Sequence, residues 1–431
     1  MARYLKQSQP QSRQHNRDLI DRVREIIGDI EQNGDAAVRR YASELDHWEG
    51  QEFRVSADEI AAARKAMSPV FKDDFAFCKK QVTDFAKRQR DSILEFEAEF
   101  GPGITLGQKL IPVDVVGCYI PGGKYPLISA ALMSVATAKA AGVNHVVGAA
   151  PPRAGEGIFP PTLYALAESG ADEIFTIGGV QAFAAMTFGR VGMRPVDMIT
   201  GPGNAYVAEA KRQLFGMVGI DLPAGPTEIL VIADDRADPA LVATDLLGQA
   251  EHGPDSPAWL IATSERLARA VLAEIERQLL TLPTAEIAGA AWQRWGEVVV
   301  VDNDDDAIRL SDQYAPEHLE VQTSRNDYYL DRLKNYGSLF IGEESTVAYG
   351  DKGVGTNHTL PTGRAARYTG GLWVGKFLKT VTYQRLTQEA SRQIAPIMAR
   401  MCASEGMAAH EITATVREER YTQRRREGSA H

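Results

Sequence analysis

The residues best suited to chemistry in this 431-residue chain are histidines that stand close to other polar side chains. His252 follows Gln249 by three positions at the predicted end of a helix, so both side chains lie on one helical face. An imidazole nitrogen and an amide oxygen in that arrangement could bind a metal ion, although glutamine is an uncommon zinc ligand. Alternatively, His252 interacts with the free carbonyl groups at the helix end. The spacing alone leaves both interpretations open.

A second candidate is the pair Glu317-His318, which follows Pro316 at a predicted junction between secondary-structure elements. A carboxyl group beside an imidazole is suited to general acid–base catalysis. Neighbouring side chains need not touch, so the two groups can serve different protons. A solvated surface turn is the alternative, and the pattern does not decide between them.

Two more histidines have a weaker context. His358 ends a polar, glycine-rich segment that begins at Gly350 and contains Asp351, which is typical of a ligand-binding loop or of a mobile surface loop. His410 lies on a predicted helix near the end of the chain, and by itself it indicates no function.

Glycines cluster after several predicted strands. Backbone without a side chain can approach a phosphate or a ribose closely. None of these clusters satisfies the G-x-G-x-x-G pattern of dinucleotide-binding proteins, so the pattern alone favours ordinary tight turns. The clusters are Gly122-Gly123, Gly178-Gly179, Gly201-Pro202-Gly203-Asn204 and Gly225-Pro226.

The elements that would position these residues form two series. Short β-branched runs alternate with amphipathic runs over residues 113–215, and again over 229–341. This alternation predicts parallel sheets covered by helices, hence an α/β fold with two doubly wound, Rossmann-like domains. Ligands in such folds bind at the carboxyl ends of the strands. Helical arms are predicted near both ends of the chain, over residues 16–43, 57–88, 388–401 and 403–417.

These patterns predict that the chain has four parts. They are an N-terminal arm of residues 1–15, a first, discontinuous α/β domain of residues 16–118 plus 229–372, a second α/β domain of residues 119–228, and a C-terminal helical arm of residues 373–431.

Composition excludes some classes of protein. The formal net charge is −10, which argues against a general binder of nucleic acid or of anionic membranes. Three cysteines are too few for a disulfide framework and fit a reducing compartment. No apolar signal region or membrane-spanning run is present, so a cytoplasmic location is expected.

Taken together, several segments resemble the histidinol dehydrogenase family. They occur in the family order and extend over residues 16–415. The matching strings are Gly117-Cys118-Tyr119-Ile120-Pro121-Gly122-Gly123, Gly178-Gly179-Val180-Gln181-Ala182, Gly201-Pro202-Gly203-Asn204, Ala224-Gly225-Pro226-Thr227-Glu228, the Gln249–His252 segment, the Ala315–Leu319 segment and Gly355-Thr356-Asn357-His358.

The resemblance implies a homodimer, with one zinc ion per subunit, that uses two NAD to oxidise a primary alcohol through an aldehyde to a carboxylate. It implies that His318, neutral near pH 7, takes the hydroxyl proton, and that Glu317 activates the water of the second step. The implied zinc ligands are Gln249, His252, Asp351 and His410, the last from the partner subunit. The implied NAD residues are Tyr119, Gln181 and Asn204, and the implied substrate residues include Thr227, His358 and Glu405.

Departures from the histidine-biosynthetic pattern indicate a different substrate. Lys124 and Lys376 stand where that pattern has neutral or acidic residues, and Trp373 stands where it has a small one. Added positive charge and lost volume favour a compact anionic substrate over the cationic histidinol. The departures resemble the sulfopropanediol 3-dehydrogenase branch, which oxidises 2,3-dihydroxypropane-1-sulfonate to 3-sulfolactate. Candidate partners of the sulfonate are Lys124, Arg364, Arg367 and Lys376.

Three alternatives remain open from the sequence. The substrate could be L-histidinol, with L-histidine as product. A zinc hydrolase could use Gln249 and His252 as ligands and Glu317 as its base. A non-catalytic paralogue would serve only as a binding dimer, although the intact Glu317-His318 pair argues against it.

Overall fold

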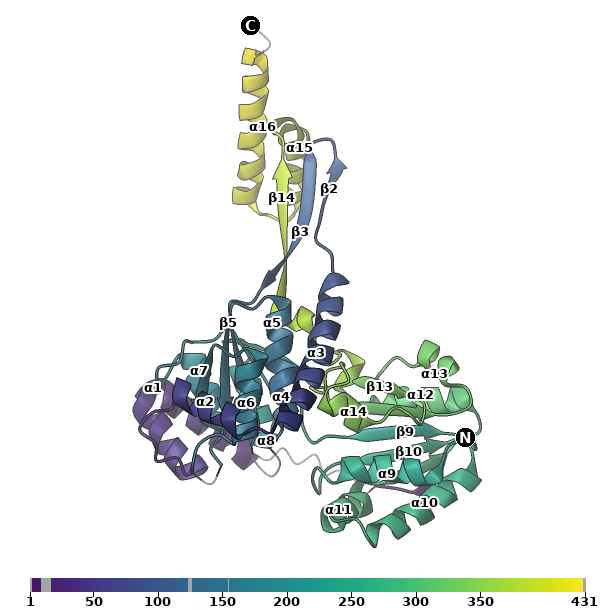
Figure 1. Ribbon diagram of the computed structural model, residues 1–431. Helices are drawn as coiled ribbons and strands as arrows, with labels where there is room; N and C mark the ends of the chain where they lie inside the picture. Colours follow the sequence, from purple (N-terminus) through teal and green to yellow (C-terminus); the bar gives the residue numbers. More distant parts are fainter. Residues whose placement is uncertain (1, 9–16, 123–125, 154, 429–431) are drawn as a thin grey trace. The chain divides into compact units, whose positions relative to one another are not determined.

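The computed structural model describes residues 2–8, 17–122, 126–153 and 155–428 (Figure 1). The chain divides into two compact units, which we describe one at a time. Unit 1 comprises residues 1–90 and 113–377, and unit 2 comprises residues 91–112 and 378–431. No helix in the described ranges has an apolar stretch long enough to cross a bilayer.

The first sheet of unit 1 has five parallel strands in the order β6-β5-β4-β7-β8. Its core consists of apolar strand residues packed against helices, including Val23, Ile26 and Ile30, which recur at helical spacing on α1. The strands are β4 (Val115–Tyr119), β5 (His145–Ala150), β6 (Glu173–Thr176), β7 (Met198–Thr200) and β8 (Gly219–Ile220). The helices of this half are α1 (Arg17–Asp46), α2 (Ala57–Ala66), α3 (Pro69–Asp91), α4 (Ile128–Ala131), the π-helical η1 (Leu132–Ala136), α5 (Thr137–Ala141), α6 (Pro160–Ser169), α7 (Gly179–Phe188) and α8 (Ala205–Leu214).

The second sheet of unit 1 has six strands in the order β1-β11-β10-β9-β12-β13, with only β1 antiparallel to its neighbour. Its strands are β1 (Arg3–Lys6), β9 (Ile229–Ala233), β10 (Ala258–Ala262), β11 (Glu297–Val300), β12 (His318–Gln322) and β13 (Ser338–Ile341). The helices are α9 (Pro239–Ala250), α10 (Glu265–Leu279), α11 (Ala285–Trp295), α12 (Asp304–Tyr314), α13 (Asn326–Arg332) and α14 (Val347–Lys352), followed by η2 (Ala365–Arg367) and η3 (Val374–Phe377).

Both faces of this sheet are buried. Ile229 and Val231 of β9 pack in one apolar cluster with α9, α10 and α11, whereas Leu230 and Ile232 pack in another with α12 and α13. Alternate residues of one strand point to opposite faces, so helices cover the sheet on both sides. In each sheet the five parallel strands follow the same doubly wound order. The predicted alternation of parallel strands and helices is therefore confirmed.

Unit 2 is a three-stranded antiparallel sheet with two helices (Figure 1). Its strands are β2 (Phe96–Gly101), β3 (Ile104–Pro112) and β14 (Leu378–Leu386), and its helices are α15 (Gln388–Ser404) and α16 (Ala408–Gly428). Strand β3 is central and pairs with β14 over nine residues, from Pro112 opposite Leu378 to Ile104 opposite Leu386. The sequence patterns predicted the two helices and missed the strands.

The structure groups the chain differently from the predicted boundaries in three places. Residues 3–6 form an edge strand of the six-stranded sheet instead of a separate arm. Helix α1 packs on α7 and α8, so residues 17–46 accompany the five-stranded sheet and not the 229–372 segment. Strands β2 and β3 group with the C-terminal segment because β3 pairs with β14. An apolar helix face predicts that the helix is packed against something, but it does not indicate against which sheet. The predicted boundaries therefore differ from the observed grouping.

Candidate active site

A cavity of about 810 Å³ in unit 1 lies between loops of the two sheets. On the five-stranded side, the lining residues follow strands, as Tyr119 ends β4 and Asn204 comes after β7. On the six-stranded side they precede strands, as Thr227 comes before β9 and Glu317 before β12. The expected location at carboxyl ends therefore holds for the first sheet and is wrong for the second. Helix α9 runs antiparallel to β9, so the carboxyl end of α9 lies at the edge of the six-stranded sheet where the parallel strands begin.

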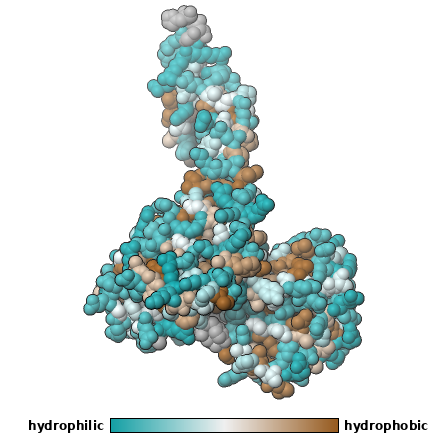
Figure 2. All heavy atoms as spheres, viewed as in Figure 1, coloured by the Kyte–Doolittle hydropathy of each residue, from teal (hydrophilic) through white to brown (hydrophobic). Residues whose placement is uncertain are grey.

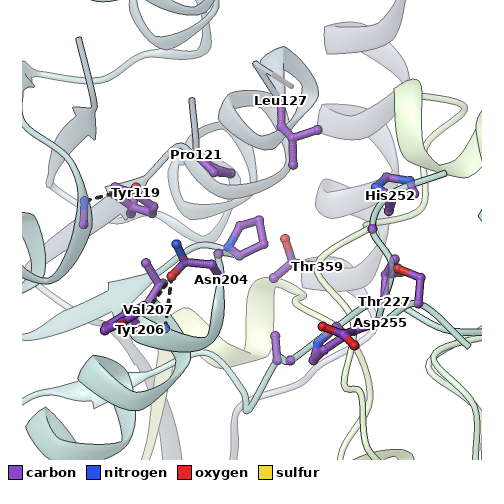
Figure 3. Close-up of a pocket in the computed structure, with 18 of the residues that line it drawn as sticks. Tyr119, Pro121, Leu127, Asn204, Tyr206, Val207, Thr227, His252, Asp255 and Thr359 are labelled. Atoms are coloured by element: carbon purple, nitrogen blue, oxygen red, sulfur yellow. Dashed lines mark hydrogen bonds between the residues drawn. The ribbon is translucent and has the colours of Figure 1, made fainter. Parts of the chain in front are cut away.

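Ten of the residues selected from the sequence line this cavity. In Figure 3, Tyr119 and Asn204 lie on one side, and Thr227 and His252 lie on the other. Residues far apart in the chain are thus gathered around one space. The ten are Tyr119, Gln181, Asn204, Thr227, Gln249, His252, Glu317, His318, Asp351 and His358.

The other selected residues are placed elsewhere. Trp373 and Lys376 belong to unit 1 but are not among the lining residues, and the ammonium group of Lys376 donates to Thr369 Oγ1 at 3.0 Å. Glu405 and His410 belong to unit 2, where both are exposed. Arg364 and Arg367 are exposed and do not line the cavity, and Lys124 lies outside the described residues.

Glu317 is a buried carboxyl group with three polar neighbours. Its Oε2 accepts hydrogen bonds from the Thr227 hydroxyl and, at 3.0 Å, from the Glu228 amide, and it lies 3.4 Å from His318 Nδ1. Burial raises the pKa of Glu317 to about 7, against the opposing effects of His318 and the hydrogen bonds. A carboxyl group that titrates near neutral pH is suited to accept a proton in catalysis.

His318 is buried between carbonyl and carboxylate oxygens. Its Nδ1 lies 3.0 Å from the Glu228 carbonyl oxygen, and its Nε2 lies 3.7 Å from Asp351 Oδ1. Nε2 has no hydrogen-bond partner among the described residues. An Nδ1–H donated to the carbonyl would leave Nε2 as the basic nitrogen of the ring.

The protonation of His318 differs from the sequence-based expectation. Burial lowers the pKa of His318, but the Glu317 and Asp351 carboxylates outweigh burial and raise that pKa to about 9. The imidazole therefore holds its proton at neutral pH while both carboxylates are free. A cation bound at Asp351 would weaken this effect and return the imidazole toward its basic form.

Three of the four predicted metal ligands line the cavity. Gln249 and His252 lie at the end of α9, and Asp351 lies in the last turn of α14. Burial lowers the pKa of His252. Burial opposes ionisation of Asp351, but His318 and His358 hold its pKa at about 2. A neutral imidazole and an ionised carboxylate are the forms that bind metal.

The described residues contain no group of three or more His, Cys, Asp or Glu arranged to hold a metal ion. Of the three predicted ligands that line the cavity, His252 and Asp351 are of these types and Gln249 is not. His410 lies in the other unit of the chain. The cavity is therefore lined by three of the four predicted ligands, whose side chains carry nitrogen and oxygen atoms of the kinds that bind zinc.

Lys352 is a cavity residue that the sequence analysis did not select. It follows Asp351 directly and forms no ion pair with any residue in the described part of the chain. Burial is the largest cause of the lowered pKa values of His252 and His358. Asp351 opposes it, and the positive charge of Lys352 lowers both values further, so the ammonium group of Lys352 lies near both rings. Lys124 and Lys376 were selected instead, because their residue types are unusual at those positions. Adjacency to Asp351 is the signal that identifies Lys352.

The five-stranded side of the cavity is organised by hydrogen bonds to backbone amides. Asp46, also missed from the sequence, accepts from the Gly178 amide at 2.8 Å and from Gln181 Nε2 at 2.9 Å. The Asn204 side chain caps α8 by accepting from the amides of Tyr206 and Val207. These contacts fix the turns that begin α7 and α8.

A buried ion pair supports the loop after β7. Lys211 and Asp221 form an ion pair with each other, and both bind the backbone of Gly201. Lys211 Nζ donates to the Gly201 carbonyl oxygen at 3.1 Å, and the Gly201 amide donates to Asp221 Oδ2 at 2.9 Å. Gly201 has a φ of +133°, and a Cβ there would lie 2.2 Å from the Tyr119 carbonyl oxygen. The loop at Gly201 is therefore held in one conformation next to Tyr119.

Comparison with known proteins finds relatives that match nearly the whole chain. The sequence profile of the family described as histidinol dehydrogenase matches residues 9–418. A histidinol dehydrogenase homolog of Shouchella clausii is 52% identical over 98% of this chain and 100% of its own length. The sulfopropanediol 3-dehydrogenase of Ruegeria pomeroyi is 46% identical over 97% of this chain and 96% of its own. The crystal structure of histidinol dehydrogenase from Elizabethkingia anophelis superimposes with a TM-score of 0.90 at 35% identity, over 96% of this chain and 95% of that one.

Proposed function

The chain belongs to the histidinol dehydrogenase family, and from this premise we propose that it oxidises a primary alcohol through an aldehyde to a carboxylate with two NAD. We propose 2,3-dihydroxypropane-1-sulfonate as the substrate and 3-sulfolactate as the product. The observation that carries the proposal is one cavity lined by an acid–base pair, an N/O donor set and the cation Lys352. The 46% identical sulfopropanediol 3-dehydrogenase supports the same choice of substrate.

In the first oxidation, His318 acts as the base. His318 lines the cavity, and its Nε2, which has no hydrogen-bond partner among the described residues, takes the hydroxyl proton while hydride leaves the carbon that bears this hydroxyl group. Bound NAD would supply the hydride acceptor, and Tyr119, Gln181 and Asn204 would hold it beside the glycine turns. The products of this step are an aldehyde, NADH and one proton.

In the second oxidation, Glu317 activates water. With a pKa of about 7, a large fraction of Glu317 is ionised at neutral pH and can remove a proton from water as its oxygen bonds to the aldehyde carbon. The resulting hydrate loses a hydroxyl proton to His318 and a hydride to the second NAD. The carboxylate product then contains one oxygen from water.

The donor set fits a zinc ion. Gln249, His252 and Asp351 would hold it, with His410 of the partner subunit as the fourth ligand. Zinc, when bound, would supply a Lewis acid that anchors and orients the substrate oxygen atoms. Nε2 of His318 lies 3.7 Å from Asp351, and a cation held by Asp351 would lower the pKa of His318 and so free this nitrogen for the substrate proton.

A homodimer would explain why two of the proposed site residues lie in unit 2. Its helices expose large apolar side chains, and Figure 2 shows brown, apolar atoms among hydrophilic ones on this unit. Exposed apolar surface of this kind marks interaction sites. We propose that a second copy covers this surface and receives His410 and Glu405 at its cavity. The exposed apolar side chains are Ile397, Met398, Met401, Met407, Ile412 and Val416.

The shared zinc site predicts complementation between inactive variants. His252→Ala and His410→Ala should each lose zinc and activity. A randomly mixed sample of the two should recover about a quarter of the wild-type activity, because half of the dimers are mixed and each mixed dimer has one intact site. Activity of the remixed variants and zinc content by atomic absorption check this prediction. No recovery on mixing, with each variant alone dimeric and inactive, would mean that one chain supplies all the ligands.

The choice of substrate predicts a specific role for Lys352. Lys352→Gln should lower kcat/KM for the sulfonated diol by about 10–100-fold, because a charge-assisted hydrogen bond contributes roughly 1.5–3 kcal/mol. Oxidation of uncharged propane-1,2-diol should change little. NADH absorbance measures both, and two NADH should form per sulfonated diol. Lys65→Gln, at an exposed position on α2, is the matched control.

The same assay discriminates among the alternatives. Robust oxidation of L-histidinol, with the sulfonated diol inert, would assign the chain to histidine biosynthesis. Substrate-dependent NADH formation in any form would exclude a zinc hydrolase and a non-catalytic dimer.

A further inference from the structure

A second layer of polar residues lies behind the catalytic residues of the six-stranded sheet. Gln322 Nε2 donates to Asp245 Oδ2 at 2.9 Å and to Glu320 Oε2 at 3.2 Å. Thr346 Oγ1 donates to Asp245 Oδ1 at 3.0 Å, and the Val347 amide donates to Glu320 Oε1 at 3.1 Å. We call these five residues the support layer. Its hydrogen bonds connect α9, β12 and the start of α14.

On each of the three elements, one residue of the support layer lies one helical turn or one strand repeat away from a residue of the proposed site. On α9, Asp245 precedes Gln249 by four residues, and on α14, Val347 precedes Asp351 by four. On β12, Glu320 follows His318 by two. Four residues along a helix and two along a strand return to the same face.

The face of β12 is independently fixed. Leu319 and Val321 pack in the apolar cluster on the α12–α13 side of the sheet. His318 and Glu320 alternate with them and therefore point to the α9 side, where Phe340 and Val347 are also buried. The three elements that carry Gln249, His318 and Asp351 are thus joined one period away from these residues.

The chemistry of the support layer favours positioning over stability. Glu320 has no exposed surface, and burial together with Asp245 raises its pKa well above the ordinary value. Gln322 Nε2 donates to both carboxyl groups, so directional hydrogen bonds hold the two side chains together. Well-packed apolar side chains would stabilise such a core equally well or better, but they would not fix distances between elements.

We propose that the Asp245–Glu320 pair is a positioning device that sets the spacing of Gln249, His318 and Asp351. The inference rests on the proposed zinc site and on the role of His318. Neither carboxyl group lines the cavity, so both act through the residues that they hold.

The test compares disruptive and conservative substitutions. Glu320→Leu should weaken zinc binding about 10–100-fold and lower kcat by a similar factor, as loss of supporting residues does at metal sites. The KM for NAD should stay within about twofold, because the NAD residues belong to the other sheet. Glu320→Gln keeps the acceptor for the Val347 amide and can donate to Asp245, so it should stay within about threefold of wild type. Competition with a chelator measures zinc affinity independently of activity.

Two further variants cover the case in which Glu320→Leu does not fold. Thr346→Val removes one hydrogen bond to Asp245 with little change in shape, and should weaken zinc binding about three- to tenfold. Leu260→Ala, in the buried β10 strand, destabilises the same sheet away from the layer and should keep wild-type zinc affinity.

Each outcome decides the proposal. Wild-type zinc affinity and kcat in Thr346→Val and in folded Glu320→Leu would overturn it, as would equal losses of zinc in Leu260→Ala or in Glu320→Gln. Failure of the unmodified protein to bind zinc would overturn the proposed function, and this inference with it. Normal wild-type binding with unaffected variants would overturn this inference alone.

Discussion

Replacing His318 with alanine should abolish both oxidations, whereas Glu317→Gln should impair the aldehyde step far more than the alcohol step. Each lost base is expected to cost about 10²–10⁴-fold in rate. His318 serves both steps, but only the second step needs water. Glu317 is also the group that raises the pKa of His318 most. Glu317→Gln should therefore lower that pKa and increase the fraction of neutral His318 that can act as the base in the alcohol step.

The measurement uses the alcohol and the aldehyde as separate substrates, with NADH formation followed in each case. Zinc content should match wild type, since neither residue is among the proposed ligands, and thermal unfolding checks that both variants are folded. Small and equal losses in both half-reactions for both variants would show that Glu317 and His318 are not the catalytic groups.

Breaking the buried Lys211–Asp221 pair should destabilise the protein by about 3–5 kcal/mol, because Lys211→Met leaves a buried carboxylate without its counterion. It should also raise the KM for NAD, since Gly201 loses a hydrogen bond on the loop that precedes Asn204. The double variant Lys211→Met/Asp221→Leu should recover most of the stability but not the KM. Urea unfolding and NAD titration of the four proteins in this cycle separate the two effects.

A half-exposed pair in the same domain serves as the control. Lys139 and Asp172 are also an ion pair, with 28% and 37% of their side chains exposed. Lys139→Met should therefore cost no more than about 1 kcal/mol and leave the KM for NAD unchanged. Equal losses for Lys139→Met and Lys211→Met would contradict the role given to burial.

The parts of the fold that sequence predicted are those with a local pattern. An apolar run predicts the strand that ends at Tyr119, and apolar residues at helical spacing predict the helix that contains Gln249. Strands β2 and β14 have no such pattern, because most of their residues are exposed and no alternation marks a buried face. Their pairing depends on contacts between distant segments, which no local window contains.

The site was predicted residue by residue, and its arrangement was not. Glu317 and His318 stood out by type and neighbourhood, but which sheet edge they occupy follows from the crossover of α9. The charge on His318 was missed because Asp351 is remote in sequence and only the fold brings it near. Lys352 was missed because its adjacency to Asp351 gains meaning only once the fold shows that both residues line the cavity.

The pairing of β3 with β14 also has a consequence for how the chain is made. A ribosome delivers β3 roughly 270 residues before β14, which at about 5–20 residues per second is a delay of tens of seconds. Throughout that interval β3 pairs with β2 alone and presents one edge of unsatisfied backbone groups, a template for association with other chains. The nascent hairpin must therefore be shielded, by a chaperone or by its own exposed charges at Glu97 and Glu99, until the last 54 residues emerge to close it.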